Sequence, residues 1–466
     1  MNSMASSADR TRLRRGLTAN AMSTVLRIAS QLVLLPVLFA FWDEARVGVW
    51  LMIFALPAYL CMAAAGVSAA GANRALAEAQ NGSASDPAAI YRAARAVALF
   101  STLLMSIAAM AAGLLILDRG IELPASVSAE EVRAALLLLG LYALVTAQTT
   151  VLEIPLRHAG RYPAHIWLQA GASAAELAAI ALLLAVGDGF ALLVAGLVAV
   201  RIAFAVGGTI IARQASPTMF ERGPGLPPPG LLRELAAPSL AFIAMPLVYG
   251  INLQGYVLLV GAVFGPAILA AFVATRTIVR LLDLFTNFVF NAQFFEAGHL
   301  PGGESAHRRR LLATTTLVTL CVSLAFAALV LLAGPPLQHA WTAGKTEFSY
   351  SLAIALLVAG TLRALAAGPI AVLSAMNAHA RIAGIYLAGS AAAIAGALVL
   401  GLAGAPLSVV AAMLIAAELS QLIPLLRSFF GTSDYSFAAL CRDLVAKERL
   451  TDITLLAGLI DPRKTR

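Results

Sequence analysis

Five polar side chains recur at helical spacing inside one long apolar run, residues 266–297. Successive positions are four, three, four and four residues apart: Arg276, Arg280, Asp283, Asn287 and Asn291. Side chains at this spacing share one face of a helix. A guanidinium group on such a face can donate two parallel hydrogen bonds to the oxygens of a phosphate. The pattern therefore predicts a wet, electropositive surface that binds a phosphate-bearing anion.

A second polar stripe lies in the apolar run 17–41, at spacings of four, three and four: Asn20, Thr24, Arg27 and Gln31. A charged side chain at the centre of a bilayer costs roughly 2.5–3.5 kcal/mol, so it must face protein or a water-filled cavity. We therefore expect both stripes to line one shared chamber. The predicted substrate-binding residues are Asn20, Arg27, Gln31, Arg276, Arg280, Asn287 and Asn291.

The one carboxylate in these stripes, Asp283, has two interpretations. It is the first candidate for coupling transport to a proton or a sodium ion. Alternatively, it neutralises Arg276 or Arg280 as a structural pair that only holds helices together. Even then one arginine of this run remains, and Arg27 adds a second positive charge.

Other charged residues near the middle of apolar runs suggest structural pairs. Glu176 and Arg201 lie in consecutive runs, so we expect a structural ion pair between them. Arg363 and Glu418 are candidates for a similar pair.

Composition indicates which elements must position these side chains. The chain has 466 residues, of which 60% are hydrophobic and 12% are charged. Soluble domains are about 45–50% apolar and about 25% charged. Because roughly 20 apolar residues cross a bilayer as a helix, we predict an all-α polytopic membrane protein with about 12 spans in two six-helix lobes. The predicted spans are 17–41, 47–72, 94–117, 132–154, 163–187, 189–212, 235–260, 266–297, 311–333, 349–374, 381–402 and 405–427.

The basic residues predict the orientation, since Lys and Arg are retained in cytoplasmic loops. With a cytoplasmic start, 23 of the 32 Lys and Arg residues fall in cytoplasmic segments and three in the opposite loops. Both termini are therefore expected in the cytoplasm. This placement also accounts for the net charge of +8 without a nucleic-acid partner.

The longest cytoplasmic connection contains GPGLPPPG, which cannot form a continuous helix, so we place the boundary between the lobes there. The predicted organisation is a cytoplasmic amino terminus at 1–16, an N-lobe at 17–212, a linker at 213–234, a C-lobe at 235–427 and a cytoplasmic tail at 428–466.

Signals of enzymatic or metal chemistry are missing from the sequence. Cys61, Cys321 and Cys441 have no metal-ligand spacing, and there is no Gly-rich loop that would cradle a phosphate. We expect no metal, no cofactor and no enzymatic activity. A membrane polysaccharide polymerase, the alternative from the enzyme class, usually needs a sizeable outer loop, and the longest predicted outer loops, 118–131 and 334–348, are short.

The amino-terminal region, NAMSTVLRIASQLVLLPVL, WDEARVGVW and AYLCMAAAGVSAAGANRALAEA, resembles the start of bacterial polysaccharide transporters of the O-antigen flippase type. These belong to a superfamily shared with the lipid II flippase and the multidrug and toxin extrusion transporters. The resemblance implies two six-helix lobes, with arginines of spans one and eight facing a central cavity. Arg27, Arg276 and Arg280 lie on the matching spans.

The same resemblance implies a substrate and partners. The expected substrate is an undecaprenyl-pyrophosphate-linked oligosaccharide, turned from the cytoplasmic to the outer leaflet of the bacterial inner membrane. Expected partners are membrane lipids, a polysaccharide polymerase and assembly proteins. A cation-coupled multidrug exporter of the same fold is the main alternative, although it would need acidic rather than basic cavity residues. A non-transporting scaffold in a polysaccharide assembly complex is a further alternative.

Overall fold

The structure is a computed structural model. It describes residues 22–23, 25–26, 29–30, 32–81, 87–119, 123–187, 189–220, 230–231, 234, 239, 247–299, 305–375, 380–432 and 442–444. Asn20, Arg27 and Gln31 of the first predicted stripe lie outside these residues, and the side chain of Asn291 is not among those described.

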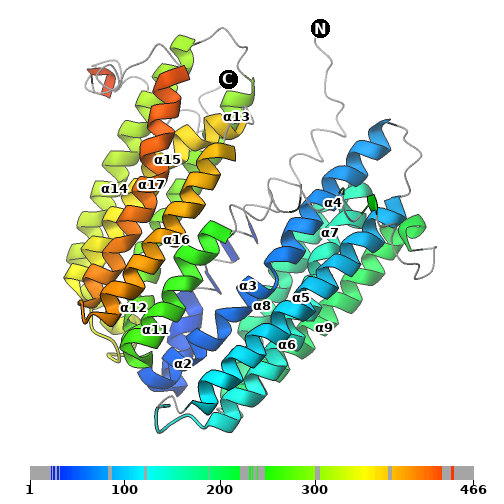
Figure 1. The fold of residues 1–466 in the computed structure, drawn as a ribbon, viewed down its shortest axis with the longest axis horizontal. Helices are drawn as coiled ribbons and strands as arrows, with labels where there is room; N and C mark the ends of the chain where they lie inside the picture. Colours follow the sequence, from blue (N-terminus) through cyan, green and yellow to red (C-terminus); the bar gives the residue numbers. More distant parts are fainter. Residues whose placement is uncertain are drawn as a thin grey trace, which may run out of the picture. The chain divides into compact units, whose positions relative to one another are not determined.

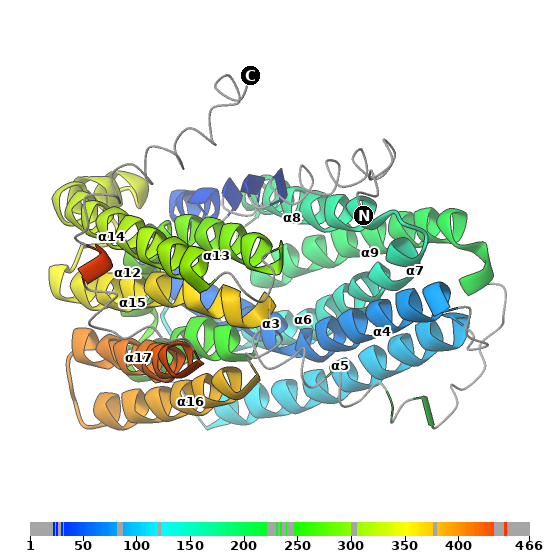
Figure 2. The same ribbon diagram turned by 90° about the horizontal axis from the view of Figure 1, so that it is seen from above.

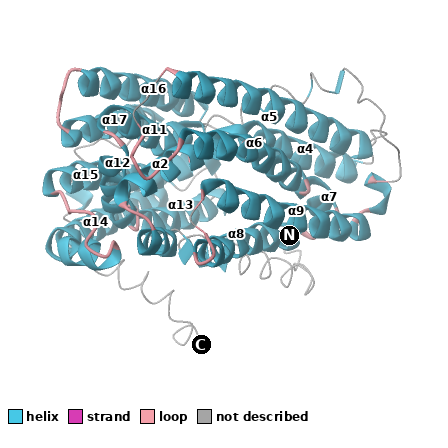
Figure 3. Ribbon diagram, turned by 90° about the horizontal axis from the view of Figure 1, so that it is seen from below, coloured by secondary structure: helices cyan, strands magenta, loops and turns pink. Residues whose placement is uncertain are grey.

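The described part of the chain is built from helices joined by short loops (Figure 3). Ten of these helices are long and apolar enough to cross a membrane, and their positions follow the predicted spans. Two shorter apolar helices, Leu32–Phe41 and Pro266–Val279, lie where spans one and eight are predicted. The all-α polytopic fold class is therefore confirmed.

Large apolar side chains cover much of the outer surface of these helices. Phe100 is 70% exposed and Leu332 is 81% exposed. Soluble monomers rarely expose large contiguous apolar patches. In a helix whose backbone groups are all bonded internally, such side chains suit contact with lipid. The chain is a multi-pass membrane protein.

The chain divides into two compact units. Unit 1 comprises Met1–Gly250 and Gly265–Ala270, and unit 2 comprises Ile251–Phe264 and Ala271–Arg466. The lobe boundaries expected from the sequence remain predictions. The elements of unit 1 are α2 (Glu44–Phe54), α3 (Leu56–Leu60), α4 (Met62–Asn81), α5 (Pro87–Asp118), α6 (Ala129–Val151), α7 (Glu153–His158), α8 (Tyr162–Leu184), α9 (Phe190–Ala215) and η1 (Pro217–Met219).

In unit 1 the long helices run alongside one another (Figure 1). Helix α6 packs against α5 and α9, α8 packs against α9, and α4 packs against α5 and α7. Small side chains such as Ala94, Ala98 and Ala147 are fully buried where these helices meet. Small residues let membrane helices approach closely, so packing and internal polar contacts hold the bundle together in lipid.

The elements of unit 2 are η2 (Ile251–Gly255), α11 (Tyr256–Phe264), α12 (Pro266–Val279, whose first residues belong to unit 1), α13 (Leu282–His299), α14 (Ser305–Trp341), α15 (Tyr350–Ala375), α16 (Ala380–Leu402) and α17 (Leu407–Thr432). Helix α15 packs against α13, α14 and α17, and α16 lies beside α17 (Figure 2). Side chains of α15 therefore have access to both α13 and α17.

Two tight turns of the chain depend on glycine. Gly265, between α11 and α12, has a φ of +88°, and Gly404, between α16 and α17, has a φ of +82°. A side chain in this left-handed region costs roughly 1–2 kcal/mol, and glycine avoids that cost.

The predicted span 266–297 is not one continuous helix. Helix α12 ends at Val279 and α13 begins at Leu282. At the junction the amide of Asp283 donates to the carbonyl of Arg280, three residues earlier, over 2.9 Å. Bonds to the third residue back wind the backbone more tightly than an α-helix. The expectation of one uninterrupted helix over 266–297 is therefore wrong, and the shared face of the five polar residues stays a prediction.

Candidate functional site

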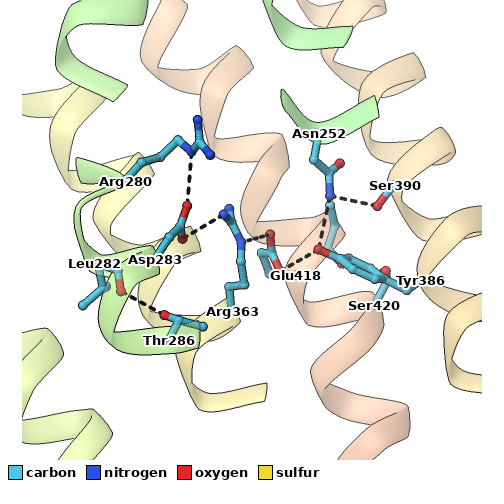
Figure 4. Close-up of polar contacts among 11 residues, drawn as sticks. Asn252, Arg280, Leu282, Asp283, Thr286, Arg363, Tyr386, Ser390, Glu418 and Ser420 are labelled. Carbon is cyan, nitrogen blue, oxygen red and sulfur yellow. Dashed lines mark hydrogen bonds and ion pairs between the residues drawn. The ribbon is translucent and has the colours of Figure 1, made fainter. Parts of the chain in front are cut away.

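A chain of alternating charges crosses unit 2. Arg280 donates from Nε to Oδ2 of Asp283 over 3.1 Å, and Arg363 donates from Nη1 to Oδ1 of the same carboxylate over 3.2 Å. Arg363 also donates from Nε to Oε1 of Glu418 over 3.0 Å. Figure 4 shows Arg363 between the two carboxylates, with Arg280 at one end of the chain. Two positive and two negative groups alternate, so each carboxylate is bonded to at least one guanidinium.

Neutral groups extend this chain at its Glu418 end. Tyr386 donates its hydroxyl to Oε2 of Glu418 over 2.9 Å. Asn252 donates from Nδ2 to the hydroxyls of Tyr386, over 3.3 Å, and Ser390, over 3.1 Å. These residues are buried, and Glu418 is only 1% exposed. This end of the network is buried, and the hydroxyls of Tyr386 and Ser390, the amide nitrogen of Asn252 and the carboxylate of Glu418 are bonded to one another, whereas Oδ1 of Asn252 has no partner among the described residues.

The opposite end of the network is more open. The side chain of Arg280 is 32% exposed and that of Asp283 is 24% exposed. Nε is the one nitrogen of Arg280 that donates to a described residue, and one terminal nitrogen of the guanidinium points away from Asp283 in Figure 4. A guanidinium with two free donors on one edge is suited to bidentate binding of an anion.

The helix break accounts for the positions of Arg280 and Asp283. Arg280 lies in the two-residue junction between α12 and α13, and Asp283 lies in the first turn of α13. A carboxylate in a first turn is favoured by the partial positive charge of the helix amino terminus. The tightened turn brings both side chains to one place, where α15 supplies Arg363.

Arg276 contacts another element of unit 2. It donates from Nη1 to the backbone carbonyl of Leu253 over 2.9 Å, and its guanidinium carbon lies 4.8 Å from the ring centroid of Phe272. The residue is 7% exposed. It therefore contacts the π-helix η2, which directly precedes α11.

The remaining predicted positions on α13 do not join the cluster. Asn287 is exposed on the helix surface, and nothing is described of the side chain of Asn291. Of the predicted substrate-binding residues, Arg280 is bonded to Asp283 in the polar network. The role assigned to each of these residues stays a prediction.

Unit 1 contains a separate ion pair. Arg201 of α9 donates from Nη2 to Oε2 of Glu176 of α8 over 2.9 Å, and from Nε to Oε1 of the same carboxylate. Tyr142 donates its hydroxyl to Oε1 of Glu176 over 2.9 Å, and Arg201 donates from Nη1 to Gln169 over 3.3 Å. The arginine and glutamate side chains are 8% and 12% exposed, so little room remains for a ligand.

Sequence reasoning missed Asn252, Tyr386 and Ser390. A signal for two of them exists, because Tyr386 and Ser390 are four residues apart in the apolar run 381–402 and therefore share one helical face. Asn252 lies two residues before Gln254 in an apolar run, a spacing that does not place the two on one helical face, so its signal is weaker. Among the described residues, no group of three or more His, Cys, Asp and Glu side chains could hold a metal ion.

No protein-family model and no curated protein matches the chain. Solved structures do share its fold. A multidrug resistance MATE family transporter of the MOP superfamily, in an inward-facing conformation, has a TM-score of 0.62 at 14% identity, covering 88% of this chain and 93% of that chain. The lipid II flippase MurJ, in an inward closed conformation, has a TM-score of 0.62 at 12% identity, covering 95% and 93%. An outward-facing MATE family transporter of the same superfamily has a TM-score of 0.50 at 12% identity, covering 92% and 96%. At these identities the likeness establishes the fold, which is the two-lobe helical fold of MOP-superfamily transporters.

Proposed function

We propose that this chain is a flippase that moves an undecaprenyl-pyrophosphate-linked oligosaccharide across the bacterial inner membrane. The lipid-linked sugar would serve the synthesis of a surface polysaccharide, such as O-antigen, capsule or exopolysaccharide. The observation that carries the proposal is the free guanidinium edge of Arg280 within a membrane-spanning unit. The fold supports it, because a lipid II flippase shares that fold over 95% of this chain.

The free edge matters because a charged side chain within a membrane span is costly, and such residues usually have a function. Asp283 uses one nitrogen of Arg280, which leaves both Nη donors for a ligand. Two parallel N–H donors match two oxygens of a phosphate better than an ammonium does. A pyrophosphate headgroup would bind at this edge while its lipid tail stays in the bilayer.

The charge pattern argues against the main rival, a cation-coupled multidrug exporter. Such a protein needs carboxylates that are available to cationic ligands. In unit 2, Asp283 is bonded to two arginines, and Glu418 is bonded to Arg363 and Tyr386. Both carboxylates are therefore occupied by donors of the protein itself, whereas the available edge belongs to an arginine.

The short connections between helices argue against the enzyme alternative. Helix α5 ends at Asp118 and α6 begins at Ala129, while α14 ends at Trp341 and α15 begins at Tyr350. Neither segment is long enough to fold as a catalytic outer domain. We propose that the protein is a transporter and catalyses no covalent reaction.

The proposed cycle is alternating access between the two lobes. Arg280 would hold the pyrophosphate from the cytoplasmic side, and rearrangement of the lobes would present it to the outer side. With both termini in the cytoplasm, an inside-negative potential favours outward movement of an anion by about 2.3 kcal/mol per charge per 100 mV. Membrane lipids, a polysaccharide polymerase and assembly proteins are the partners that this activity would need.

Deletion and complementation in the bacterial host test the proposal. Loss of the chain should abolish the surface polysaccharide and cause undecaprenyl-pyrophosphate-linked oligosaccharide to accumulate on the cytoplasmic leaflet. Complementation with Arg280→Ala should fail at wild-type membrane level. Arg133→Ala is the matched control, because Arg133 pairs with one carboxylate, Asp118, at an exposed position; it should complement fully.

Two outcomes would contradict the proposal. Unchanged surface polysaccharide and unchanged lipid-linked oligosaccharide in the deletion strain would rule out the proposed flippase activity. Full complementation by Arg280→Ala, with polysaccharide lost in the deletion strain, would point to a scaffold that does not handle the pyrophosphate.

A further inference from the structure

We propose that Arg363 is a resident cation, a guanidinium built into the slot between two carboxylates where a transporter would otherwise need a dissociable metal ion. The inference deepens the proposed function, since it states how the transport cycle is coupled: the cycle would require no Na⁺. Its structural part stands on unit 2 alone. The sequence marks Asp283 as the first candidate for ion coupling, and the contacts of Arg363 assign that carboxylate a permanent partner instead.

The geometry of Arg363 is that of a bridging cation. The side chain leaves α15 and donates to Asp283 of α13 over 3.2 Å and to Glu418 of α17 over 3.0 Å. Helix α15 packs against both of these helices, so one positive group joins three helices. Metal cations such as Na⁺ and Ca²⁺ connect elements through carboxylate oxygens in the same way. Here the donors are N–H groups of the chain.

A guanidinium differs from a metal ion in two respects that matter for transport. It stays protonated in proteins, and it is covalently attached, so it cannot leave the slot when the lobes rearrange. Glu418 lies at the buried end of the network, where its charge needs a partner in every state of the cycle. Arg363 supplies that partner without an ion from either side of the membrane.

Removing the guanidinium should turn the slot into an inorganic cation site. In Arg363→Gln, Glu418 would lose its guanidinium partner and would face Asp283 across the slot, while Asp283 would keep its bond to Arg280. Like charges at such a position repel strongly in a low dielectric, and a small cation would relieve the repulsion. Arg363→Lys keeps a positive charge in the slot and should not create the site.

Thermal unfolding of the purified full-length chain tests this directly. Unfolding midpoints are measured in NaCl and in choline chloride at equal ionic strength. Wild type and Arg363→Lys should each show midpoints within about 1 °C in the two salts. Arg363→Gln should unfold at lower temperature in choline chloride and regain roughly 5 °C in NaCl, because Na⁺ binds its folded state. Arg133→Gln, at an exposed pair, should match wild type in both salts.

Sodium stabilisation of the wild type would overturn the proposal, because the slot would then already accept a metal ion. An Arg363→Gln variant with the same midpoint in both salts would overturn it as well. If Arg363→Gln does not fold, radioactive Na⁺ binding to the wild type decides: no saturable binding supports the proposal, and saturable binding contradicts it.

Flipping in proteoliposomes provides the second readout. Replacing Na⁺ by choline should leave the wild-type rate of lipid-linked oligosaccharide flipping unchanged, whereas Na⁺-dependent flipping would overturn the resident-cation proposal. Absence of flipping in both salts would contradict the proposed function instead, and the unfolding measurements would still decide the role of Arg363.

Discussion

Each unit holds an arginine–carboxylate network among its spans. The two networks differ in how many guanidinium nitrogens are bonded within the protein, and a network in which all three are bonded is called closed. In unit 1, Arg201 uses Nε, Nη1 and Nη2 on Glu176 and Gln169. In unit 2, Arg280 donates to the described residues from Nε alone. The side chain of Arg201 is 8% exposed and that of Arg280 is 32% exposed. The same residue types are therefore structural where all three guanidinium nitrogens donate within the protein, and available to a ligand where nitrogens remain.

Burial explains why the closed network should matter for folding. A buried ion pair contributes little relative to apolar packing, but removing one partner leaves the other charge unpaired. Glu176 and Arg201 depend on each other in this way. Asp283, by contrast, lies between two arginines at the more open end of its network, where water can compensate for a lost partner.

The largest effect is expected from Glu176→Gln in unit 1. The substitution preserves shape but leaves the buried Arg201 without a negative partner, which should lower the free energy of unfolding by about 3–5 kcal/mol. Thermal unfolding in detergent, with the amount of folded protein in membranes as a second readout, measures this. A variant as stable as wild type would show that Arg201 does not depend on Glu176.

A smaller loss is expected from Glu418→Gln in unit 2. Arg363 keeps Asp283 as a partner in this variant, and the amide can still accept a hydrogen bond from Tyr386. We expect a decrease of about 1.5–3 kcal/mol, the usual range for a hydrogen bond to a charged group. The same unfolding assay compares the two variants. If Glu418→Gln lost more unfolding free energy than Glu176→Gln, the unit 2 network would contribute more to stability than the unit 1 network, which is the opposite of what we expect.

Replacing the closed pair with apolar residues should have a still smaller effect. In Glu176→Leu combined with Arg201→Met, no unpaired charge remains, and stability should return to within about 1 kcal/mol of wild type. Surface polysaccharide should also be retained, because this network has no open edge for a ligand. Loss of polysaccharide in a stable double variant would give the unit 1 network a part in transport.

The smallest effect is expected at the exposed pair of Arg133 and Asp118, whose side chains are 44% and 60% exposed. Solvent screening limits such pairs to about 0–1 kcal/mol. Arg133→Ala should therefore match wild type in unfolding and in polysaccharide output. A loss comparable to that of Glu176→Gln would show that arginine pairs of this protein cannot be ranked by burial.

The sequence could predict the spans and the charged residues within them, because an apolar run of about 20 residues and a charge inside it are local signals. It also suggested that Glu176 faces Arg201 and that Arg363 faces Glu418, and the structure contains both contacts. It could not predict the contact of Arg363 with Asp283, which lies 80 residues earlier in the chain.

The helix break between α12 and α13 could not be predicted from the sequence either. The junction reads TIVRLLDL, with no proline or glycine to interrupt a helix. Periodicity therefore placed Arg276, Arg280 and Asp283 on one stripe. In the structure Arg280 donates to Asp283, and Arg276 donates to the backbone carbonyl of Leu253.

The central claim is that the free edge of Arg280 binds the pyrophosphate group during transport, and flipping by the reconstituted chain tests it most directly. Proteoliposomes carry a fluorescent undecaprenyl-pyrophosphate-linked oligosaccharide, and a membrane-impermeant quencher reports how much reaches the outer leaflet. We expect rapid flipping by the wild type, a rate at least about tenfold lower for Arg280→Ala, and an intermediate rate for Arg280→Lys, which keeps the charge but loses the paired donors. Wild-type flipping by a folded Arg280→Ala variant would contradict the account.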